Sequence, residues 1–468
     1  MKDFARLDRA FNPRSIAVIG DNGRNNFMWL RAQSTYKGKL YSVHINPATV
    51  ERIQKIGIPN YSSILDIPEP VDLAIVAVPR KVALQTLEDC IHKGVAAAHY
   101  YTAGFAETDT EEGRQLEYQL AERAKRADFY LIGPNCLGIL NPKLGIRQRE
   151  EQCVDVSGPV GFISQSGNHT VTFSIEGHLQ GVDIDKAISY GNGVVLDAPV
   201  FLEYFGQDEG IKVIGMYLEG VRDGRRFLRV LKEVSAKKPV VIWKGGRTEA
   251  GGRAIASHTA SLAVSQAVWD SAVRQAGALA VSNLEELIDT IKALEYLSSV
   301  TGDRVALAGG SGGQSVAITD AFAEAGLTVP LLTRESYDRF AAFFNLVGAS
   351  CRNPIDPGAN RREIGRIMDI LEQDANIDNL VLIVWLLAWQ GASELLDKTI
   401  SSMIKLRQRT AKPLMVITPT FSTPENLQQL SSIACKFQGG GIPVFSTVER
   451  AARALRNALE YYKFKSRT

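Results

Sequence analysis

The stretch KPVVIWKGGRTEAGGRAIASHTASLA, residues 238–263, joins an apolar run to a glycine-rich segment that holds one histidine, His258. The β-branched run at its start is typical of a strand buried in a parallel sheet. Such a strand would place the glycine-rich segment at the carboxyl edge of the sheet, where open α/β folds bind ligands. The residues beside His258 are small, so its ring would be accessible to attack phosphorus or transfer a proton. A histidine in a polar loop can equally be a solvated bystander, so its role depends on which groups lie near it.

The first third of the chain alternates short apolar runs with helical patterns. The runs are residues 15–20, 40–45, 72–78, 97–102 and 129–133. This βαβ alternation predicts a Rossmann-like, doubly wound parallel sheet over residues 1–150. No complete G-x-G-x-x-G follows the first run, and the second run lacks the acidic residue that would bind the ribose of NAD. The pattern disfavours a dehydrogenase, and a Rossmann-like domain without a ligand stays an alternative.

The rest of the chain reads as two similar α/β domains in tandem. Residues 158–167 and 303–313 each give a strand, a turn of small residues and the start of a helix, and later strand runs recur in the same order. We expect two flavodoxin-like domains, at residues 151–300 and 301–468. The segment around His258 is longer than its counterpart after Pro413. A long loop that the fold does not need tends to be functional or disordered.

The composition excludes several classes of protein. The 468 residues carry 53 basic and 51 acidic side chains, and the net charge of +2 gives no electrostatic basis for binding nucleic acid. No apolar run has the length of a signal peptide or a membrane span, so we expect a cytoplasmic protein. The five cysteines lack C-x-x-C spacing, so the sequence predicts neither a metal site nor a disulfide framework.

Several turns are expected to meet the His258 segment at one edge of the middle sheet, because loops after successive parallel strands share that edge. One turn lies at a helix start, where hydroxyl and N–H groups favour phosphate, although a serine there could simply cap the helix. It consists of Ser164, Gln165, Ser166 and Gly167. Glu219 follows another apolar run and could orient the ring of His258, or it could be an ordinary exposed acid. A histidine, a carboxylate and an anion cradle suit phosphoryl transfer better than acyl hydrolysis, and no nucleophile elbow, P-loop or H-E-x-x-H pattern occurs.

Together these motifs resemble the α subunit of NDP-forming acyl-CoA synthetases, especially the ADP-forming acetyl-CoA synthetases, and more distantly the succinyl-CoA synthetase α subunit. The resemblance covers nearly the full length. It rests on SIAVIG (15–20), AVP (77–79), TAGFAE (102–107), GPNCLGILNP (133–142), GFISQSG (161–167), YLEG (217–220) and ASHTASLA (256–263). It implies an N-terminal CoA-binding domain followed by two flavodoxin-like domains.

The resemblance also implies a reversible reaction in which acyl-CoA, ADP and phosphate give a carboxylic acid, CoA and ATP through acyl phosphate and phosphohistidine. His258 would carry the phosphoryl group, and Glu219 would stabilise it. The phosphate and acyl groups would contact Ser164, Gln165, Ser166, Gly167, Asn192 and Gly193. CoA would contact Gly20, Asn22, Arg24, Asn46, Pro47, Val78, Pro79, Thr102, Ala103, Gly104, Asn135 and Cys136.

Three α/β domains use the whole chain, so the resemblance implies a separate ATP-grasp β subunit in an α2β2 assembly. That subunit would bind ATP or ADP and Mg²⁺, and the glycines near His258 would let the segment carry phosphate between the two chains. The alternative is a non-catalytic regulatory protein that binds CoA or acyl-CoA on the same scaffold. The sequence does not identify the carboxylic acid.

The first glycine turn departs from the pattern of this family. It reads GDNGRNNFMW (20–29), with Asp21 beside Gly20 in place of a small residue and a P-G-K-type segment. A carboxylate facing the phosphates of CoA would be unfavourable. Therefore Asp21 points away, or the affinity for CoA is altered, or the domain has lost its ligand. Arg24 could replace the missing lysine.

Overall fold

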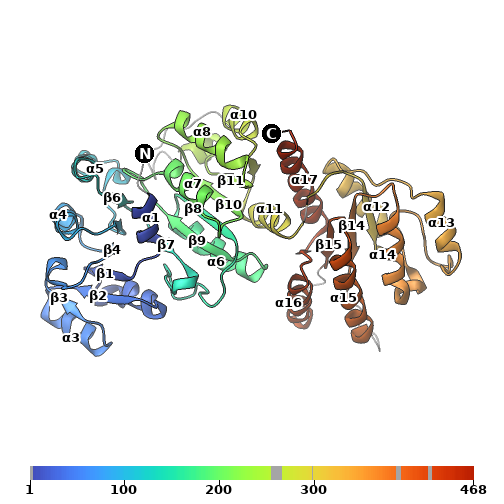
Figure 1. Cartoon of the computed structure of the whole chain (residues 1–468), viewed down its shortest axis with the longest axis horizontal. Helices are drawn as coiled ribbons and strands as arrows, with labels where there is room; N and C mark the ends of the chain where they lie inside the picture. The colour runs from blue at the N-terminus through green and yellow to red at the C-terminus, as the bar shows by residue number, and fades with distance from the viewer. Residues whose placement is uncertain (1–3, 254–265, 298, 386–391, 420–423, 468) are drawn as a thin grey trace. The chain divides into compact units, whose positions relative to one another are not determined.

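The computed structural model describes residues 4–253, 266–297, 299–385, 392–419 and 424–467. His258, the predicted phosphoryl carrier, lies outside these residues. The chain divides into two compact units, Met1–Leu284 and Glu285–Thr468. Figure 1 shows the strands and helices of each unit, which are described in turn. The predicted domain boundaries at residues 150 and 300 stay predictions.

The first sheet of the N-terminal unit has six parallel strands in the order β3-β2-β1-β4-β5-β6. The strands are β1 (Ser15–Ile19), β2 (Lys39–Val43), β3 (Asn60–Tyr61), β4 (Leu73–Val76), β5 (Ala97–Tyr100) and β6 (Tyr130–Ile132). Its helices are α1 (Phe4–Phe11), α2 (Met28–Ala32), α3 (Pro47–Lys55), α4 (Ala83–Lys93) and α5 (Glu111–Arg126). Strands β1, β4, β5 and β6 are buried along their whole length, as in sheets covered on both faces. The strand order reverses between β1 and β4, which is where doubly wound sheets bind ligands.

The second sheet of this unit has the order β12-β11-β10-β8-β9-β7. The strands are β7 (Gly138–Leu140), β8 (Val160–Ser164), β9 (Ile184–Ser189), β10 (Val213–Leu218), β11 (Val240–Lys244) and β12 (Leu279–Val281). Its helices are α6 (Gly167–Leu179), α7 (Ala198–Gln207), α8 (Gly224–Ser235) and α10 (Gln266–Gln275). Strand β7 is antiparallel to β9 and comes from the GPNCLGILNP motif, so that motif links the two sheets. An antiparallel edge strand on a parallel sheet is common, because a short connection can supply it.

Contacts of helix α1 with α7 and with the residue after β7 hold the two sheets of this unit together. The Phe11 ring packs against Phe201, Tyr204 and Phe205 of α7. The Asn141 amide, after β7, donates to the Phe11 carbonyl over 2.8 Å. These contacts make one continuous core from residues of both sheets.

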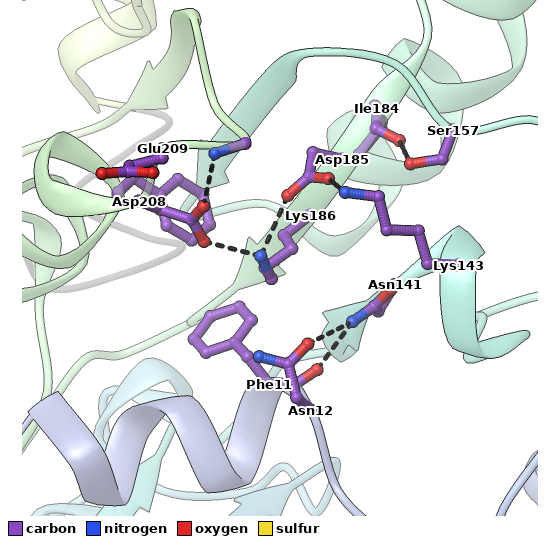
Figure 2. A network of polar contacts seen from close by, with 12 residues as sticks. Phe11, Asn12, Asn141, Lys143, Ser157, Ile184, Asp185, Lys186, Asp208 and Glu209 are labelled. Atoms are coloured by element: carbon purple, nitrogen blue, oxygen red, sulfur yellow. Dashed lines mark hydrogen bonds and ion pairs between the residues drawn. The ribbon is translucent and has the colours of Figure 1, made fainter.

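Figure 2 shows Lys186 between Asp185 and Asp208 at the start of β9, with Lys143 reaching Asp185 from another side. The Lys186 ammonium donates to Asp185 over 2.9 Å and to Asp208 over 2.6 Å. The Asp185 side chain is fully buried and that of Lys186 is 8% exposed. This network lies at the end of β9 opposite to the edge where ligands are expected.

The C-terminal unit contains one parallel sheet with the order β13-β14-β15-β16. The strands are β13 (Val305–Ala308), β14 (Asn379–Ile383), β15 (Leu414–Ile417) and β16 (Val444–Phe445). The helices are α11 (Leu284–Tyr296), α12 (Gly312–Glu324), α13 (Arg334–Ala341), α14 (Ile364–Gln373), α15 (Ala392–Arg409), α16 (Pro424–Gly439) and α17 (Val448–Lys465). The predicted fold class, an α/β protein with parallel sheets, is therefore confirmed. None of the helices in the described part of the chain has the length and apolar character needed to cross a bilayer.

Helix α11 is held within the C-terminal unit by a buried ionic cluster. The Arg450 guanidinium of α17 donates to both carboxylate oxygens of Asp289, over 2.6 and 3.0 Å. The Lys292 ammonium donates to the Val444 carbonyl over 2.9 Å and lies 4.8 Å from the centre of the Phe445 ring. Burial lowers the pKa of Lys292 to about 8, and the nearby Asp289 carboxylate opposes the shift.

We expect Lys292→Met to remove a rise in stability that occurs between about pH 8 and pH 10. The pKa of Lys292 is lower in the folded chain than in the unfolded chain, where it is about 10.4. The unfolded state therefore binds more protons in this window, and the wild-type free energy of unfolding rises with pH by up to about 3 kcal/mol. Asp289 keeps its bidentate partner Arg450, so the variant leaves no buried carboxylate uncompensated. Urea unfolding of both proteins at pH 7.5 to 10 measures the effect, and parallel pH profiles would contradict it.

Candidate active site

The turn after β8 leads into helix α6 at Gly167, where a neighbouring side chain leaves no room for a Cβ. Ser166 caps the helix, since its hydroxyl accepts the N–H of His169 at 3.4 Å. The Ser164 hydroxyl donates to the Ser166 carbonyl over 2.7 Å and accepts the Ser166 N–H over 3.1 Å. A Cβ at Gly167 would lie 2.7 Å from Cγ of Leu137. The structure thus confirms that Ser166 caps the helix. The positive end of the α6 dipole lies at the carboxyl edge of the sheet.

Gln165 joins this turn to Glu219, as the predicted convergence requires. Its Oε1 accepts the N–H groups of Glu219 and Gly220, the latter over 2.9 Å. Glu219 is 7% exposed, so the interpretation as an exposed loop acid is wrong. The Tyr217 hydroxyl donates to Oε1 of Glu219 over 3.3 Å. Gln165 thus ties the backbone of Glu219 to the start of α6, and Tyr217, two residues earlier at the end of β10, contacts the carboxylate.

Lys244, at the end of β11, adds a buried cation to the same edge. Its ammonium donates to the carbonyls of Glu219 and Gly245, over 2.7 and 2.6 Å. Burial lowers the pKa of Lys244, and Glu219 opposes this effect. Lys244 therefore fixes the end of β10 against the start of the glycine-rich segment.

His169 is a member of this site that sequence reasoning missed. Its ring centre lies 4.2 Å from that of Tyr217 and 4.5 Å from that of Trp243. Burial lowers the pKa of His169, and the charge of Glu219 opposes the shift. The available signal was its place in the first turn of the helix after the predicted phosphate cradle.

Asn192 and Gly193, predicted to contact phosphate or the acyl group, lie where the edges of the two sheets meet. The Asn192 amide donates to Glu107 and Glu117, over 2.8 Å in each case. Its oxygen accepts from the Asn135 amide at 3.5 Å. Gly193 has a φ of +57°, a value that suits glycine. Asn192 therefore ties the TAGFAE and GPNC turns to the loop after β9, and a role in binding a ligand stays a prediction.

The predicted CoA residues of the first sheet gather at the strand ends around the switch point. A Cβ at Gly20, where φ is +84°, would lie 2.6 Å from Cγ1 of Val78. The Thr102 hydroxyl donates to the Val78 carbonyl over 2.7 Å, and the Asn135 N–H donates to the Thr102 carbonyl over 3.1 Å. Gly104 donates its N–H to Glu107 over 2.6 Å. The ends of β1, β4, β5 and β6 thus form one connected edge with accessible backbone.

The remaining predicted CoA residues differ in exposure and chemistry. Asn46 caps α3 through its side-chain oxygen, which accepts the Thr49 N–H at 3.1 Å. Burial raises the pKa of the Cys136 thiol to about 12, so this cysteine is protonated and unsuited to nucleophilic chemistry. The exposed members of the set are Arg24, Asn46, Pro47, Pro79 and Ala103.

Asp21 points away from the surface of the first glycine turn. Its carboxylate accepts the N–H groups of Trp29 and Leu30, over 3.0 and 2.9 Å, and that of Asn22 over 3.0 Å. The residue is 4% exposed, and burial raises its pKa. The N–H groups at the start of α2 are consequently occupied by Asp21, so they do not serve the phosphates of a ligand.

The described residues contain no group of three or more His, Cys, Asp and Glu side chains arranged for a metal ion. The contacts described above leave two candidate sites, which are the carboxyl edges of the two sheets. Asn192 connects these edges. One edge has helix-end N–H groups, a histidine and a buried carboxylate, and the other has glycine turns with positive φ next to Val78 and Thr102.

Comparison with known proteins agrees with this arrangement. Residues 14–142 match the model of the CoA binding domain, and residues 157–294 match that of the succinyl-CoA ligase like flavodoxin domain. The chain is 34% identical to acetate–CoA ligase [ADP-forming] II subunit alpha of Pyrococcus furiosus, over 96% of each chain. It is 36% identical to acetate–CoA ligase [ADP-forming] I of Archaeoglobus fulgidus over 81% of its own length, but it spans only 55% of that protein.

A solved structure covers the whole chain. The dinucleotide forming acetyl-coenzyme A synthetase 1 of Ca. Korarchaeum cryptofilum, in complex with phosphate and ADP, is 30% identical and has a TM-score of 0.86, with 100% of this chain and 98% of that chain covered. The resemblance inferred from the motifs and the predicted order of α/β domains are confirmed. The chain belongs to the NDP-forming acyl-CoA synthetases of the succinyl-CoA ligase superfamily, as a homologue of the alpha subunit of ADP-forming acetate–CoA ligase.

Proposed function

We propose that this chain catalyses the phosphoryl-transfer half of a reversible acyl-CoA synthetase reaction, with a phosphohistidine at His258. The observation that carries the proposal is the link made by Gln165. This side chain accepts N–H groups from Glu219 and Gly220, which fixes the backbone of Glu219 beside the amino end of α6, and the Tyr217 hydroxyl donates to the buried Glu219 carboxylate over 3.3 Å. A helix-end anion site and an oriented carboxylate are the two groups that a phosphorylated imidazole requires.

The proposed chemistry has three balanced steps. A phosphate oxygen bonds to the acyl carbon while the thioester C–S bond breaks, and the thiol leaves with a proton. A ring nitrogen of His258 then bonds to phosphorus while the bond to the acyl oxygen breaks, which releases the carboxylate. A terminal phosphate oxygen of ADP finally bonds to phosphorus while the N–P bond breaks, which gives ATP and restores the imidazole. Helix-end N–H groups at Gly167 would balance the phosphate charge, and Glu219 would hold the other ring nitrogen of His258.

The edge of the first sheet fits CoA, a long and strongly anionic substrate. A Cβ at Gly20 would lie 2.6 Å from Val78, a Cβ at Gly104 would lie 2.9 Å from Arg80, and both residues have positive φ, so these tight turns favour glycine at each position. The Arg80 guanidinium donates to the Gly104 carbonyl over 2.8 Å and to the Glu112 carboxylate over 2.6 Å, so the cation at this edge is already paired with one acid. The inward Asp21 removes the repulsion that its position first suggested, although the N–H groups of α2 are used. Turns around Gly20, Val78 and Gly104 would therefore hold CoA.

The length of the relatives supports a separate partner chain. The alpha subunit of Pyrococcus furiosus and this chain each cover 96% of the other, whereas the Archaeoglobus protein extends well beyond the match. We infer an ATP-grasp β subunit that binds ATP or ADP with Mg²⁺, in an α2β2 assembly. Acetate, named in these relatives, is the first acid to test.

A labelling experiment tests the proposed function. The full chain is incubated with acetyl-CoA, [³²P]phosphate and Mg²⁺, and separately with [γ-³²P]ATP and the β partner. We expect a phosphoryl adduct that is labile in acid and stable in base, as phosphohistidine is, and we expect His258→Ala to lack it.

His178→Ala is the matched control, because His178 lies at the far end of α6 and contacts Asp183 over 2.6 Å. This variant should label like the wild type. Wild-type protein that stays unlabelled under both conditions would contradict the proposal and favour a regulator that binds acyl-CoA.

A further inference from the structure

We propose that His169 is an additional anion-binding residue of the phosphate cradle, and that its imidazole hydrogen-bonds the bound phosphate and takes up a proton as the anion binds. This inference rests on the proposed function and adds a residue that the predicted set of site residues does not include. It concerns binding of phosphate, not the covalent transfer.

The position of His169 brings its ring to the edge where phosphate is expected. It is the third residue of the thirteen-residue helix α6, and its backbone N–H donates to the hydroxyl of the capping Ser166. Helix-end dipoles act over the first turn, so a side chain in that turn meets the same anion as the N–H groups.

The ring of His169 is held in place by two aromatic neighbours from two different strands. Tyr217 lies near the carboxyl end of β10, and Trp243 lies near that of β11. Their ring centres lie 4.2 and 4.5 Å, respectively, from the ring centre of His169. The Trp243 ring meets it edge-on, at an interplanar angle of 61°. His169 is half-buried, so part of its ring still reaches solvent. A ring fixed in this way loses little conformational entropy when it binds a ligand.

The charges around the ring favour proton uptake on binding. In the described residues, Glu219 acts on the charge of the ring and Tyr217 contacts it, both at the end of β10, while Lys244 is the cation that follows the other ring neighbour, Trp243, on β11. Tyr217 donates to Glu219, and burial raises the pKa of its hydroxyl. Lys244 is engaged with two backbone carbonyls. Burial lowers the pKa of His169 itself, so the free site holds mostly neutral imidazole at pH 7.

A bound phosphate dianion reverses this balance, because an adjacent negative charge favours the imidazolium form. Binding of the anion and binding of a proton are then linked, and the affinity for the anion rises as the pH falls. A neutral hydrogen bond from a backbone N–H gives no such linkage. The pH profile therefore separates His169 from the helix-end contribution.

The experiment measures anion binding by the full chain with isothermal titration calorimetry. Inorganic sulfate serves as the probe for the pH profile between about pH 6 and pH 8, because its own charge is constant there, and inorganic phosphate serves at pH 7. For the wild type we expect the affinity for sulfate to rise as the pH falls, by at most about tenfold per pH unit, which is the limit for one linked proton. We also expect net proton uptake, measured in two buffers of different ionisation enthalpy.

Two variants and a control make the result specific. His169→Phe keeps a ring against Tyr217 and Trp243 but has no nitrogen. We expect it to bind phosphate about tenfold more weakly than the wild type, and we expect its affinity for sulfate not to change with pH. His169→Gln keeps one N–H donor, so it should regain part of the affinity and still lack the slope. His178→Gln, on the same helix, should behave as the wild type.

The outcomes distinguish this inference from the proposed function. If the wild type binds phosphate and His169→Phe has the same affinity and the same pH slope, the inference is wrong and the proposed function stands. If the wild type binds neither anion at any pH, both are wrong. If His169→Phe is unfolded, as judged by thermal unfolding, His169→Gln decides, because a wild-type slope in that variant also overturns the inference.

Discussion

Replacing Glu219 with glutamine is expected to lower turnover by about 10²- to 10⁴-fold without unfolding the protein. The chain uses the backbone of Glu219 to build the site, since its N–H donates to Gln165 and its carbonyl accepts from Lys244. Glutamine preserves both contacts and the shape of the side chain. It removes the negative charge that would stabilise a phosphorylated, partly positive imidazole at His258.

Two readouts make the Glu219 prediction sharp. Pre-steady-state labelling should show a phosphoryl adduct that forms more slowly or decays faster, while the KM for acyl-CoA stays near its wild-type value. Glu203→Gln is the matched control, because Glu203 contacts Arg226 on α8 over 3.3 Å and lies outside the proposed site. Its turnover should stay near that of the wild type. Normal turnover in Glu219→Gln would exclude the carboxylate from the phosphoryl-transfer step.

The sequence predicts the strands and the turns well, because buried parallel strands leave continuous apolar runs and their ends share one edge. The TAGFAE, GPNC and SQSG motifs accordingly lie at strand ends. The pattern cannot give the direction of a single side chain. Asp21 turns inward only because the chain adopts left-handed conformations at Asn26 and Phe27, with φ values of 51° and 53°, which bring the start of α2 to its carboxylate.

Contacts between segments far apart in the sequence are also invisible to local patterns. The cluster in which the rings of His169, Tyr217 and Trp243 contact one another depends on three elements, α6, β10 and β11, and no motif records it. The tie from Asn192 to Glu107 and Glu117 joins two sheets, and the short strand β7 crosses from one to the other. Residue types at strand ends thus indicate a site, whereas packing decides which of them take part.

Lys186→Met is expected to lower the free energy of unfolding of the N-terminal unit by about 3–5 kcal/mol. Burial alone would lower the pKa of Lys186, but hydrogen bonds from its ammonium to Asp208 and Asp185 outweigh burial and raise it. The Asp185 side chain is fully buried and that of Asp208 is 16% exposed, so removal of the ammonium leaves charge in a poorly solvated site. Breaking one side of such a cluster costs more than the intact cluster contributes.

Urea unfolding at pH 7 measures the effect of Lys186→Met, and Lys143→Met is its matched control. Lys143 reaches the same Asp185, but its side chain is 54% exposed, so we expect a loss of at most about 1 kcal/mol. The deficit of Lys186→Met should also shrink below about pH 4. The Lys186 contact lowers the pKa of Asp208 against the effect of burial, so the stability it contributes is present above the unfolded pKa and is lost as the carboxylate is protonated. Equal losses in the two variants at pH 7, or a deficit independent of pH, would mean that Lys186 acts through packing of its carbon chain and not through its charge.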